Sequence, residues 1–241
     1  MLEKTRGIFL HYINYSDSSI IARIYTEKFG QQSYLVNGIH SRRGGLKINL
    51  FQPLFLLELE VYYKPGRTLQ RIKSFRMAIP FEQIPFDVKR SSQAIFLSEV
   101  LMKCLKEEES NPGLFEFLFH SACLLDLKDQ GNSNFLIAFL FRLTQYLGIF
   151  PRPPEDGGER FFDLVSASFM QDEPFHHQFM NAEATAKFTE LFRYDLSEIE
   201  KLSFQNRHRT VLLSKLLEYY KIHLDLSGEM KSLAVLKEIL G

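Results

Sequence analysis

The sequence opens with two short runs that decide the fold, Gly7-Ile-Phe-Leu-His-Tyr-Ile13 and Ser19-Ile-Ile-Ala-Arg-Ile-Tyr25. Both runs are rich in β-branched and aromatic residues, which is typical of β-strands. The segment between them, Asn14-Tyr-Ser-Asp-Ser18, has the composition of a turn. Three further runs of the same kind cover residues 32–37, 54–63 and 68–73. Five short strands joined by turns predict a small closed barrel of the OB-fold type.

After Pro80 and Pro85 the spacing of apolar residues changes to that of α-helices. Ser91 and Ser92 are expected to cap the first helix, which would run to Glu109. The other expected helices cover residues 111–128, 132–148, 182–194, 195–202, 206–224 and 229–240. Residues 151–178 interrupt them with a Pro- and Gly-rich loop and a possible short hairpin over 161–170. The sequence therefore predicts an α+β chain in two parts: an OB-fold barrel over residues 1–80, and an α-helical domain over 81–241 with an irregular or hairpin insertion near 151–178.

A net charge of zero conceals a division between these two parts. Residues 1–76 contain 12 Lys and Arg against 5 Asp and Glu, a net charge of +7. The remaining residues contain 17 against 24, a net charge of −7. Such asymmetry indicates a polyanionic partner for the basic barrel.

The basic loop Ser41-Arg-Arg-Gly-Gly-Leu-Lys47 is the most specific candidate for nucleic-acid binding. Its two glycines let the backbone approach a ligand closely, and its cations can neutralise phosphates. The alternative is an ordinary solvated loop. The candidate DNA-binding cations of the barrel are Lys4, Arg6, Arg23, Arg42, Arg43, Lys47, Arg67, Arg71, Lys73 and Arg76. Tyr12, Tyr34 and Tyr62 could stack on unpaired bases, although strand tyrosines more often pack in a core.

No motif for catalysis or for a cofactor is found. The sequence has no GxxxxGK[ST], GxGxxG, HExxH or CxxC pattern, and its three consecutive glutamates at 107–109 are typical of a solvated helix end. His176 and His177 are adjacent, and neighbours on an extended chain point in opposite directions, so a metal site is not expected there. Cys104 and Cys123 fall on apolar helix faces, where we expect reduced, buried and unreactive thiols. The cations of Asn206-Arg-His-Arg209 could hold an anion or form ion pairs with Glu198 or Glu200.

The sequence predicts a cytoplasmic protein. No apolar segment of signal-peptide type follows Met1, and no apolar run is long enough to span a membrane. Two cysteines inside helical patterns do not form a secreted disulfide framework.

Several motifs together resemble the RecO family of DNA recombination and repair mediators. They are Thr5-Arg-Gly-Ile8, Tyr15-Ser-Asp-Ser-Ser19, Tyr25-Thr-Glu-Lys-Phe-Gly30, Val36-Asn-Gly38, Leu50-Phe-Gln-Pro53, Tyr62-Tyr-Lys-Pro-Gly66 and Leu69-Gln-Arg-Ile72. Residues 208–224 and 231–236 extend the similarity into the helical part. The resemblance implies an OB-fold joined to a helical domain, binding of single- and double-stranded DNA, strand annealing and assistance in loading recombinase. It also implies two partners, RecR and the acidic, Phe-ended C-terminal tail of single-strand-binding protein.

Two expectations qualify this resemblance. Many family members carry a four-cysteine zinc motif after the central helices, but residues 151–178 contain no cysteine, so we expect no zinc and a hairpin held by Phe161, Phe162, Phe169 and Phe175. For the tail, we expect a groove on the helical domain with Arg142, Arg193, Arg207 or Arg209 at its rim. The alternative function is a non-catalytic scaffold whose basic barrel binds an acidic protein.

Overall fold

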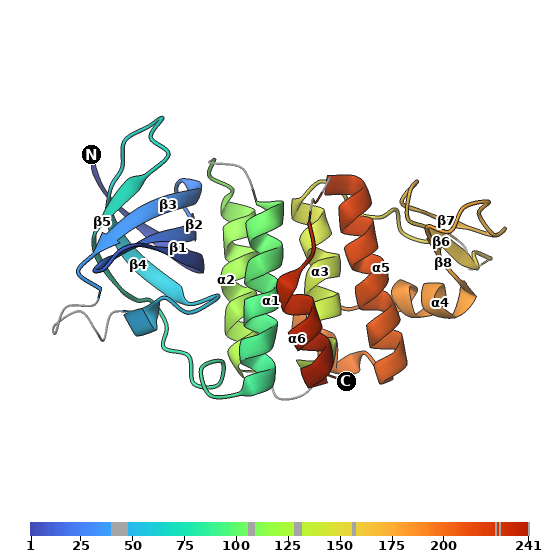
Figure 1. Ribbon diagram of the computed structural model, residues 1–241. Helices are drawn as coiled ribbons and strands as arrows, with labels where there is room; N and C mark the ends of the chain where they lie inside the picture. The colour runs from blue at the N-terminus through green and yellow to red at the C-terminus, as the bar shows by residue number, and fades with distance from the viewer. Residues whose placement is uncertain are drawn as a thin grey trace. The chain divides into compact units, whose positions relative to one another are not determined.

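The structure is a computed structural model that describes residues 1–39, 48–105, 109–127, 132–155, 158–224, 226 and 228–240. The chain forms two compact units: Met1–Leu127 together with Met230–Leu240, and Lys128–Glu229 (Figure 1). In the described part of the chain, no helix is long and apolar enough to cross a membrane. The two units are described separately.

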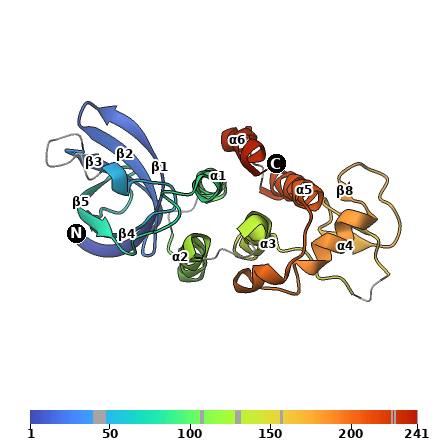
Figure 2. The same ribbon diagram turned by 90° about the horizontal axis from the view of Figure 1, so that it is seen from below.

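A closed five-stranded barrel forms the first part of the first unit. Its strands are β1 (Leu2–Ser16), β2 (Ser19–Thr26), β3 (Gly30–Asn37), β4 (Leu56–Tyr62) and β5 (Gln70–Met77). They close in the order β1-β2-β3-β5-β4, and all neighbours are antiparallel except β3 and β5 (Figure 2). This arrangement confirms the predicted OB-like barrel. Strand β1 is longer than predicted because it pairs with β4 along its first half and with β2 along its second.

Gly7 lies at the point where β1 passes from one partner strand to the other. It is opposite both Thr26 of β2 and Leu57 of β4. A Cβ atom at this position would lie 2.7 Å from Ile24 Cγ2 and 2.8 Å from Leu59 Cδ1, inside the barrel core. Glycine within a strand often marks such a close approach. The missing side chain thus lets β1 serve both halves of the barrel.

Three helices complete the first unit: α1 (Val88–Cys104), α2 (Pro112–Leu127) and α6 (Lys231–Leu240). The start of α2 is as predicted, with the side chain of Asn111 accepting from the amide of Leu114 at 3.0 Å. The predicted cap of α1 is wrong, because Asp87 occupies the cap and accepts from the amide of Arg90. Ser91 and Ser92 lie inside the helix, and their hydroxyls donate to the carbonyl of Val88. The helix also ends at Cys104, five residues before the predicted end.

Glu99 of α1 holds the start of α6. Its carboxylate accepts from the amides of Lys231 and Ser232 at 2.9 and 2.8 Å, and from the Ser232 hydroxyl at 2.5 Å. These amides have no partner within their own helix, because the first turn of any helix leaves its N–H groups unpaired. Burial tends to raise the pKa of Glu99, but the hydrogen bonds from Ser232 and Lys231, with the nearby charge of Lys103, hold it below its usual range. A negative charge on α1 therefore fastens α6 to the first unit.

Replacing Glu99 with Gln is expected to lower the free energy of unfolding at pH 7 by about 1 kcal/mol, the usual effect of losing a helix cap. Since the folded pKa of Glu99 is depressed, its contribution is present above the unfolded value of about 4.3 and disappears as the pH falls through the folded value. Urea denaturation should therefore show a gap between wild type and variant at pH 7 that closes as the pH falls below the unfolded pKa and through the lower folded one. Glu173→Gln, in an exposed loop, is the control. A gap that is constant with pH would contradict this role.

Asp126, near the end of α2, organises the segment that leads into α1. Although only 2% exposed, its carboxylate accepts from three consecutive backbone amides: Glu82 at 2.9 Å, Gln83 at 2.9 Å and Ile84 at 2.7 Å. The guanidinium of Arg90 donates to the carbonyl of Asp126 itself. The side chain of Asp126 thus joins the segment that follows the barrel to α2, and its backbone carbonyl joins α2 to α1.

The second unit contains helices and a small three-stranded sheet. Its elements are η2 (Asn132–Asn134), α3 (Phe135–Tyr146), β6 (Phe161–Asp163), β7 (Ser168–Met170), β8 (Phe179–Met180), α4 (Ala182–Glu190), η3 (Leu196–Lys201) and α5 (Asn206–Leu224). Helix α3 is buried almost throughout, as its apolar sequence predicts. Two adjacent tyrosines of α5 are buried with their hydroxyls satisfied, Tyr219 donating to Ile149 and Tyr220 to Leu140, each at 2.7 Å. The hairpin of β6 and β7 and the bounds of α5 are as predicted.

Several other predictions for this unit are wrong. The helix expected over 182–194 ends at Glu190, the segment 195–202 forms a 3₁₀-helix, and β8 adds a third strand to the hairpin. Phe162 and Phe169 do pack, since both contact the buried Phe188 of α4. Phe175, in contrast, is fully exposed and contributes nothing to the core. Neither cysteine is fully buried: Cys104 and Cys123 are both half-buried.

Candidate nucleic-acid interface

The side of the barrel formed by β1, β4 and β5 carries cations that already face carboxylates. Across these strands Lys4 is opposite Glu60, and Glu58 is opposite Arg76. The Nζ atoms of Lys4 and Lys73 lie 3.7 and 3.3 Å from Glu60. Nε of Arg76 donates to Glu58 at 2.7 Å. Because each of these cations has a negative partner, this surface presents little net positive charge to a polyanion.

Arg6 is used inside the first unit. Its guanidinium donates to both carboxylate oxygens of Glu27, at 3.0 and 2.8 Å, and also to Glu116 of α2. It lies 5.0 Å from the ring centroids of both Phe115 and Phe119. Hydrogen bonding to Arg6 lowers the pKa of Glu27, and Glu27 in turn raises the pKa of Arg6. These contacts bind the barrel to α2 and leave Arg6 poorly placed to meet a phosphate.

The side formed by β2, β3 and β5 differs. Arg23 and Arg71 project from its strands, Arg67 lies in the turn before β5, and all three are exposed. Within the described ranges, none of the three forms an ion pair. Arg71 is opposite Leu35 of β3 and Tyr62 of β4, so these three residues form a row across three neighbouring strands. These arginines are free to neutralise phosphates.

Two exposed tyrosines lie on the other two strands of the barrel, β4 and β1. Tyr62 is 49% exposed and directly opposite Arg71, while Tyr15 at the end of β1 is 62% exposed. Tyr34 is wholly buried in the barrel core, and burial raises the pKa of its hydroxyl, so the suggestion that it stacks on bases is wrong. Tyr12 packs partly against Phe9. Tyr62 and Tyr15 are thus the tyrosines of the barrel best placed to stack on bases.

Tyr15 was not identified from the sequence. It lies in an irregularity of the β1–β2 pairing between Asn14 and Ser16, next to the turn that joins the strands. Extending the outward alternation of β1 by one step into the apparent turn would have found it. Arg42, Arg43 and Lys47 lie outside the described residues.

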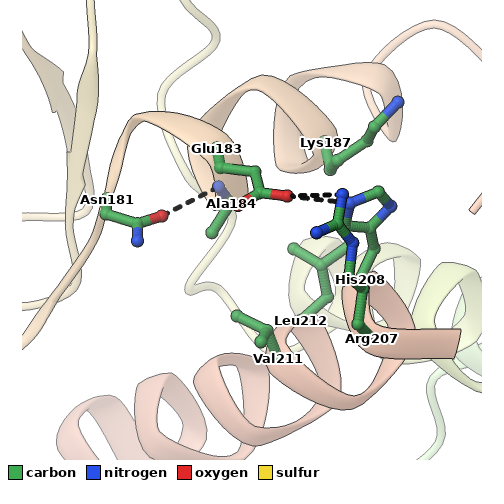
Figure 3. Close-up of a pocket in the computed structure, with 8 residues that line it drawn as sticks. All are labelled: Asn181, Glu183, Ala184, Lys187, Arg207, His208, Val211 and Leu212. Carbon is green, nitrogen blue, oxygen red and sulfur yellow. Dashed lines mark hydrogen bonds and ion pairs between the residues drawn. The ribbon is translucent and has the colours of Figure 1, made fainter. Parts of the chain in front are cut away.

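The four arginines predicted for partner binding do not converge. Arg142 is largely buried and donates to the carbonyls of Leu191 and Tyr194 at 3.3 and 2.6 Å. Arg209 donates to the carbonyl of Phe204. Arg193 is exposed, and Arg207 lines a small cavity (Figure 3).

Arg207 forms an ion pair and its neighbour His208 a hydrogen bond, but not with the expected partner. Both contact Glu183 of α4, at 3.2 and 3.1 Å, rather than Glu198 or Glu200. Helix α4 is close to the start of α5 in the fold but distant in sequence, so spacing could not reveal this pair.

The small sheet does not fit a zinc ion. Among the residues that the structure describes, no group of three or more His, Cys, Asp and Glu side chains could hold a metal. Asp163 lies instead within a hydrogen-bonded turn, accepting from the amide of Val165 at 2.8 Å and the hydroxyl of Ser166 at 2.7 Å, with His176 at 3.3 Å. Burial tends to raise the pKa of Asp163, but these bonds hold it below its usual range. Phenylalanine packing and this carboxylate stabilise the sheet.

Comparisons with known proteins cover the whole chain. The family model described as Recombination protein O N terminal matches residues 1–81, and the model described as Recombination protein O C terminal matches residues 85–234. A protein named DNA repair protein RecO from Phocaeicola vulgatus is 38% identical over 241 residues, which is 100% of both chains. Proteins of the same name from Bacteroides fragilis and Flavobacterium psychrophilum are 36% and 35% identical over 240 residues, 99% of each chain.

Proposed function

We propose that this chain, which belongs to the RecO family of DNA repair proteins, binds single- and double-stranded DNA, anneals complementary strands and assists recombinase loading. The observation that carries this proposal is the division of the barrel surface. Cations on the β1-β4-β5 side are paired with carboxylates, while Arg23, Arg67 and Arg71 are exposed and unpaired within the described ranges.

Annealing requires a surface that screens two polyanions and leaves their bases free to pair. Arginines supply the screening through phosphate contacts, which position a strand without reading its sequence. Exposed Tyr62 and Tyr15 offer faces on which single-stranded bases can stack. In OB-folds the outer surface of the second and third strands, with the loops beside it, is the usual place for oligonucleotides. Arg23 lies on that surface, and Arg71 lies on the strand beside it.

We propose that the protein performs this role without bond-making chemistry of its own. Of the five barrel carboxylates, Glu3, Glu27, Glu58 and Glu60 are in ion pairs with lysine or arginine. A nuclease needs clustered carboxylates that can bind metal ions, and Asp17 alone does not make such a cluster.

Family membership also suggests the binding partners and the cellular location of the protein. RecR and the acidic tail of single-strand-binding protein are the proposed partners, and cytoplasmic association with the nucleoid follows from a role on DNA. Arg207 and Arg193 are the better candidates for the tail, because Arg142 and Arg209 are engaged by backbone carbonyls.

A salt titration of binding to a labelled single strand tests the proposal. We expect log affinity to fall linearly with log salt, because each phosphate contact on a single strand contributes about 0.7 to the slope. If the protein does not bind the strand, or if salt does not weaken the binding, the alternative function is favoured: a non-catalytic scaffold whose barrel binds an acidic protein.

Replacing Arg42 and Arg43 with Ala is expected to flatten this slope by up to about 1.4, if both residues contact phosphate. The loss should be similar for any base sequence, and strand annealing should fall with it. Fluorescence anisotropy across a salt series measures the slope, and a thermal melt checks folding. An unchanged slope in the folded double variant would show that this loop does not contact DNA. Arg23, Arg67 and Arg71 would then be the proposed phosphate contacts.

A further inference from the structure

A cavity of about 330 Å³ opens on the barrel beside the middle of β1. Residues 9–12 of β1 line one side of it, and residues between 48 and 53, which include the start of η1 (Ile48–Leu50), line the other. The volume is at the lower end of the range for small-molecule sites, about 300–1,000 Å³. The cavity therefore suits a small ligand of one or two rings rather than a folded partner.

Aromatic rings form one wall of the cavity. The ring centroids of Phe9 and Phe51 are 5.4 Å apart, and those of Phe9 and Tyr12 are 6.2 Å apart. Phe9 and Phe51 belong to the barrel core, and Tyr12 packs against it. The ring of His11 is nearly parallel to that of Tyr12, at 20° and 6.4 Å. The core thus holds this aromatic wall in place before any ligand arrives.

The backbone on both sides of the cavity is irregular. The pairing of β1 with β2 changes register between Phe9 and His11, and such bulges re-aim side chains next to binding sites. Leu54, which follows the other side, has a φ of 65°, a strained value for a bulky residue. Its amide donates to the carbonyl of Phe9 at 2.8 Å, and the amide of Phe9 donates to Phe55 at 2.9 Å. These two bonds fix the sides of the cavity to each other.

The polar side chains of the cavity are neutral amides and an imidazole. Asn49, Gln52 and His11 are exposed, and within the described residues none of the three side chains forms a hydrogen bond or an ion pair within the protein. No Lys, Arg, Asp or Glu is among the described residues that line the cavity. A phosphate or a carboxylate is best held by a cation, whereas an amide offers both a donor and an acceptor. The lining therefore favours a neutral, planar ligand that carries donors and acceptors.

A cation for a phosphate lies immediately beside this neutral cavity. His11 of the cavity is directly opposite Arg23 of β2, and Arg23 is exposed. Residues directly opposite each other on antiparallel strands project from the same face, with Cβ atoms about 4.5–5.5 Å apart. A neutral aromatic pocket next to one arginine matches the charge distribution of a nucleotide, which has a neutral base and an anionic phosphate.

We propose that this cavity binds one unpaired nucleobase of a DNA strand whose phosphate is neutralised by Arg23. The inference rests on the proposed DNA-binding function and deepens it. The base packs against the aromatic wall, and the amides of Asn49 and Gln52 form hydrogen bonds with its Watson–Crick edge. A base within a duplex cannot enter, because its edge is paired and its faces are stacked. Tyr15 and Tyr62 stack on bases at the open surface, whereas this cavity selects single strands over duplexes.

The test uses the full chain and three fluorescent DNAs of equal length: a single strand, a strand made of abasic nucleotides, and a duplex. Replacing Asn49 and Gln52 together with alanine should weaken binding to the single strand about tenfold, since each neutral hydrogen bond contributes about two- to tenfold. Tyr12→Leu should weaken it at least about fivefold through lost contact with the base. Neither variant should change affinity for the abasic strand or the duplex by more than about twofold. The slope of log affinity against log salt should stay that of wild type, because no phosphate contact is lost.

The matched control replaces two exposed amides outside the cavity, Gln83 and Gln145, with alanine and should bind all three DNAs like wild type. Thermal melts check folding, and the variant of the exposed Asn49 and Gln52 decides the test if Tyr12→Leu is unstable. Wild-type affinity of that variant for the single strand overturns the proposal, as does an equal loss on the abasic strand or the duplex. A wild-type chain that binds none of the DNAs overturns the proposed function itself. Wild-type binding to the abasic strand that falls with salt, together with variants that follow wild type on every DNA, overturns the base pocket alone.

Discussion

Replacing Asp126 with alanine should lower the free energy of unfolding of the first unit by about 3–5 kcal/mol, because it leaves one buried and two partly buried amides without their acceptor. Those amides belong to Glu82, Gln83 and Ile84, and Ile84 is itself 2% exposed. Each unsatisfied buried donor costs about 1–3 kcal/mol, and partial hydration of this segment should keep the total below the full sum. Few single substitutions reach this size, and those that do usually break a buried polar network.

Urea denaturation followed by circular dichroism measures the loss. Asp126→Asn keeps one side-chain acceptor and should lie between wild type and Asp126→Ala. Asp172→Ala, in an exposed loop of the second unit, is the matched control and should change stability by less than about 0.5 kcal/mol. A loss below about 1 kcal/mol in Asp126→Ala would show that solvent replaces the carboxylate without difficulty.

Replacing Arg23 and Arg71 together with alanine should weaken binding to a single strand by about 100-fold at moderate salt. A charge-assisted hydrogen bond is worth about 1.5 kcal/mol or more, which is at least about tenfold per arginine. The slope of log affinity against log salt should fall by about 1.4. Both arginines are exposed and, in the described part of the chain, unpaired, so the substitutions should leave the barrel folded.

The matched control carries the same loss of two positive charges, at Lys4 and Arg76. These residues already face Glu60 and Glu58, and we expect their removal to change affinity by less than about threefold, since an exposed ion pair contributes little. Fluorescence anisotropy over a salt series compares the two double variants. An equal loss in both would mean that overall charge, rather than the β2-β3-β5 side, determines binding.

The fold was predictable wherever short-range pattern decides structure. Alternating aromatic and β-branched residues identified all five barrel strands, and Asn111 followed by Pro112 identified the start of α2. The prediction failed where a contact with a residue distant in the sequence determines the local structure. Ser91 and Ser92 have the composition of a cap, but Asp87 takes that role four residues earlier because the preceding segment is held by Asp126. No local pattern reveals that contact.

The candidate interface was predictable in its chemistry but not in its membership. Charge counting gives the excess of cations in the barrel part of the chain, yet it cannot distinguish an arginine opposite a glutamate from an unpaired one. Arg76 and Arg71 lie five residues apart on one strand, and only the register of β4 gives Glu58 to Arg76 and Tyr62 to Arg71. The sequence does not reveal burial either. Tyr34 and Tyr62 both lie in strand-like segments, but Tyr34 is in the core and Tyr62 is exposed.

The bond between Glu99 and α6 also has a consequence for the order in which the protein is made. Helix α6 belongs to the first unit, but the ribosome produces it only after the whole of the second unit. Until then, the carboxylate of Glu99 and the face of α1 that packs on α6 have no partner from that helix. The nascent first unit is therefore incomplete throughout synthesis of the second, and helix α6 completes it only after the second unit has been made.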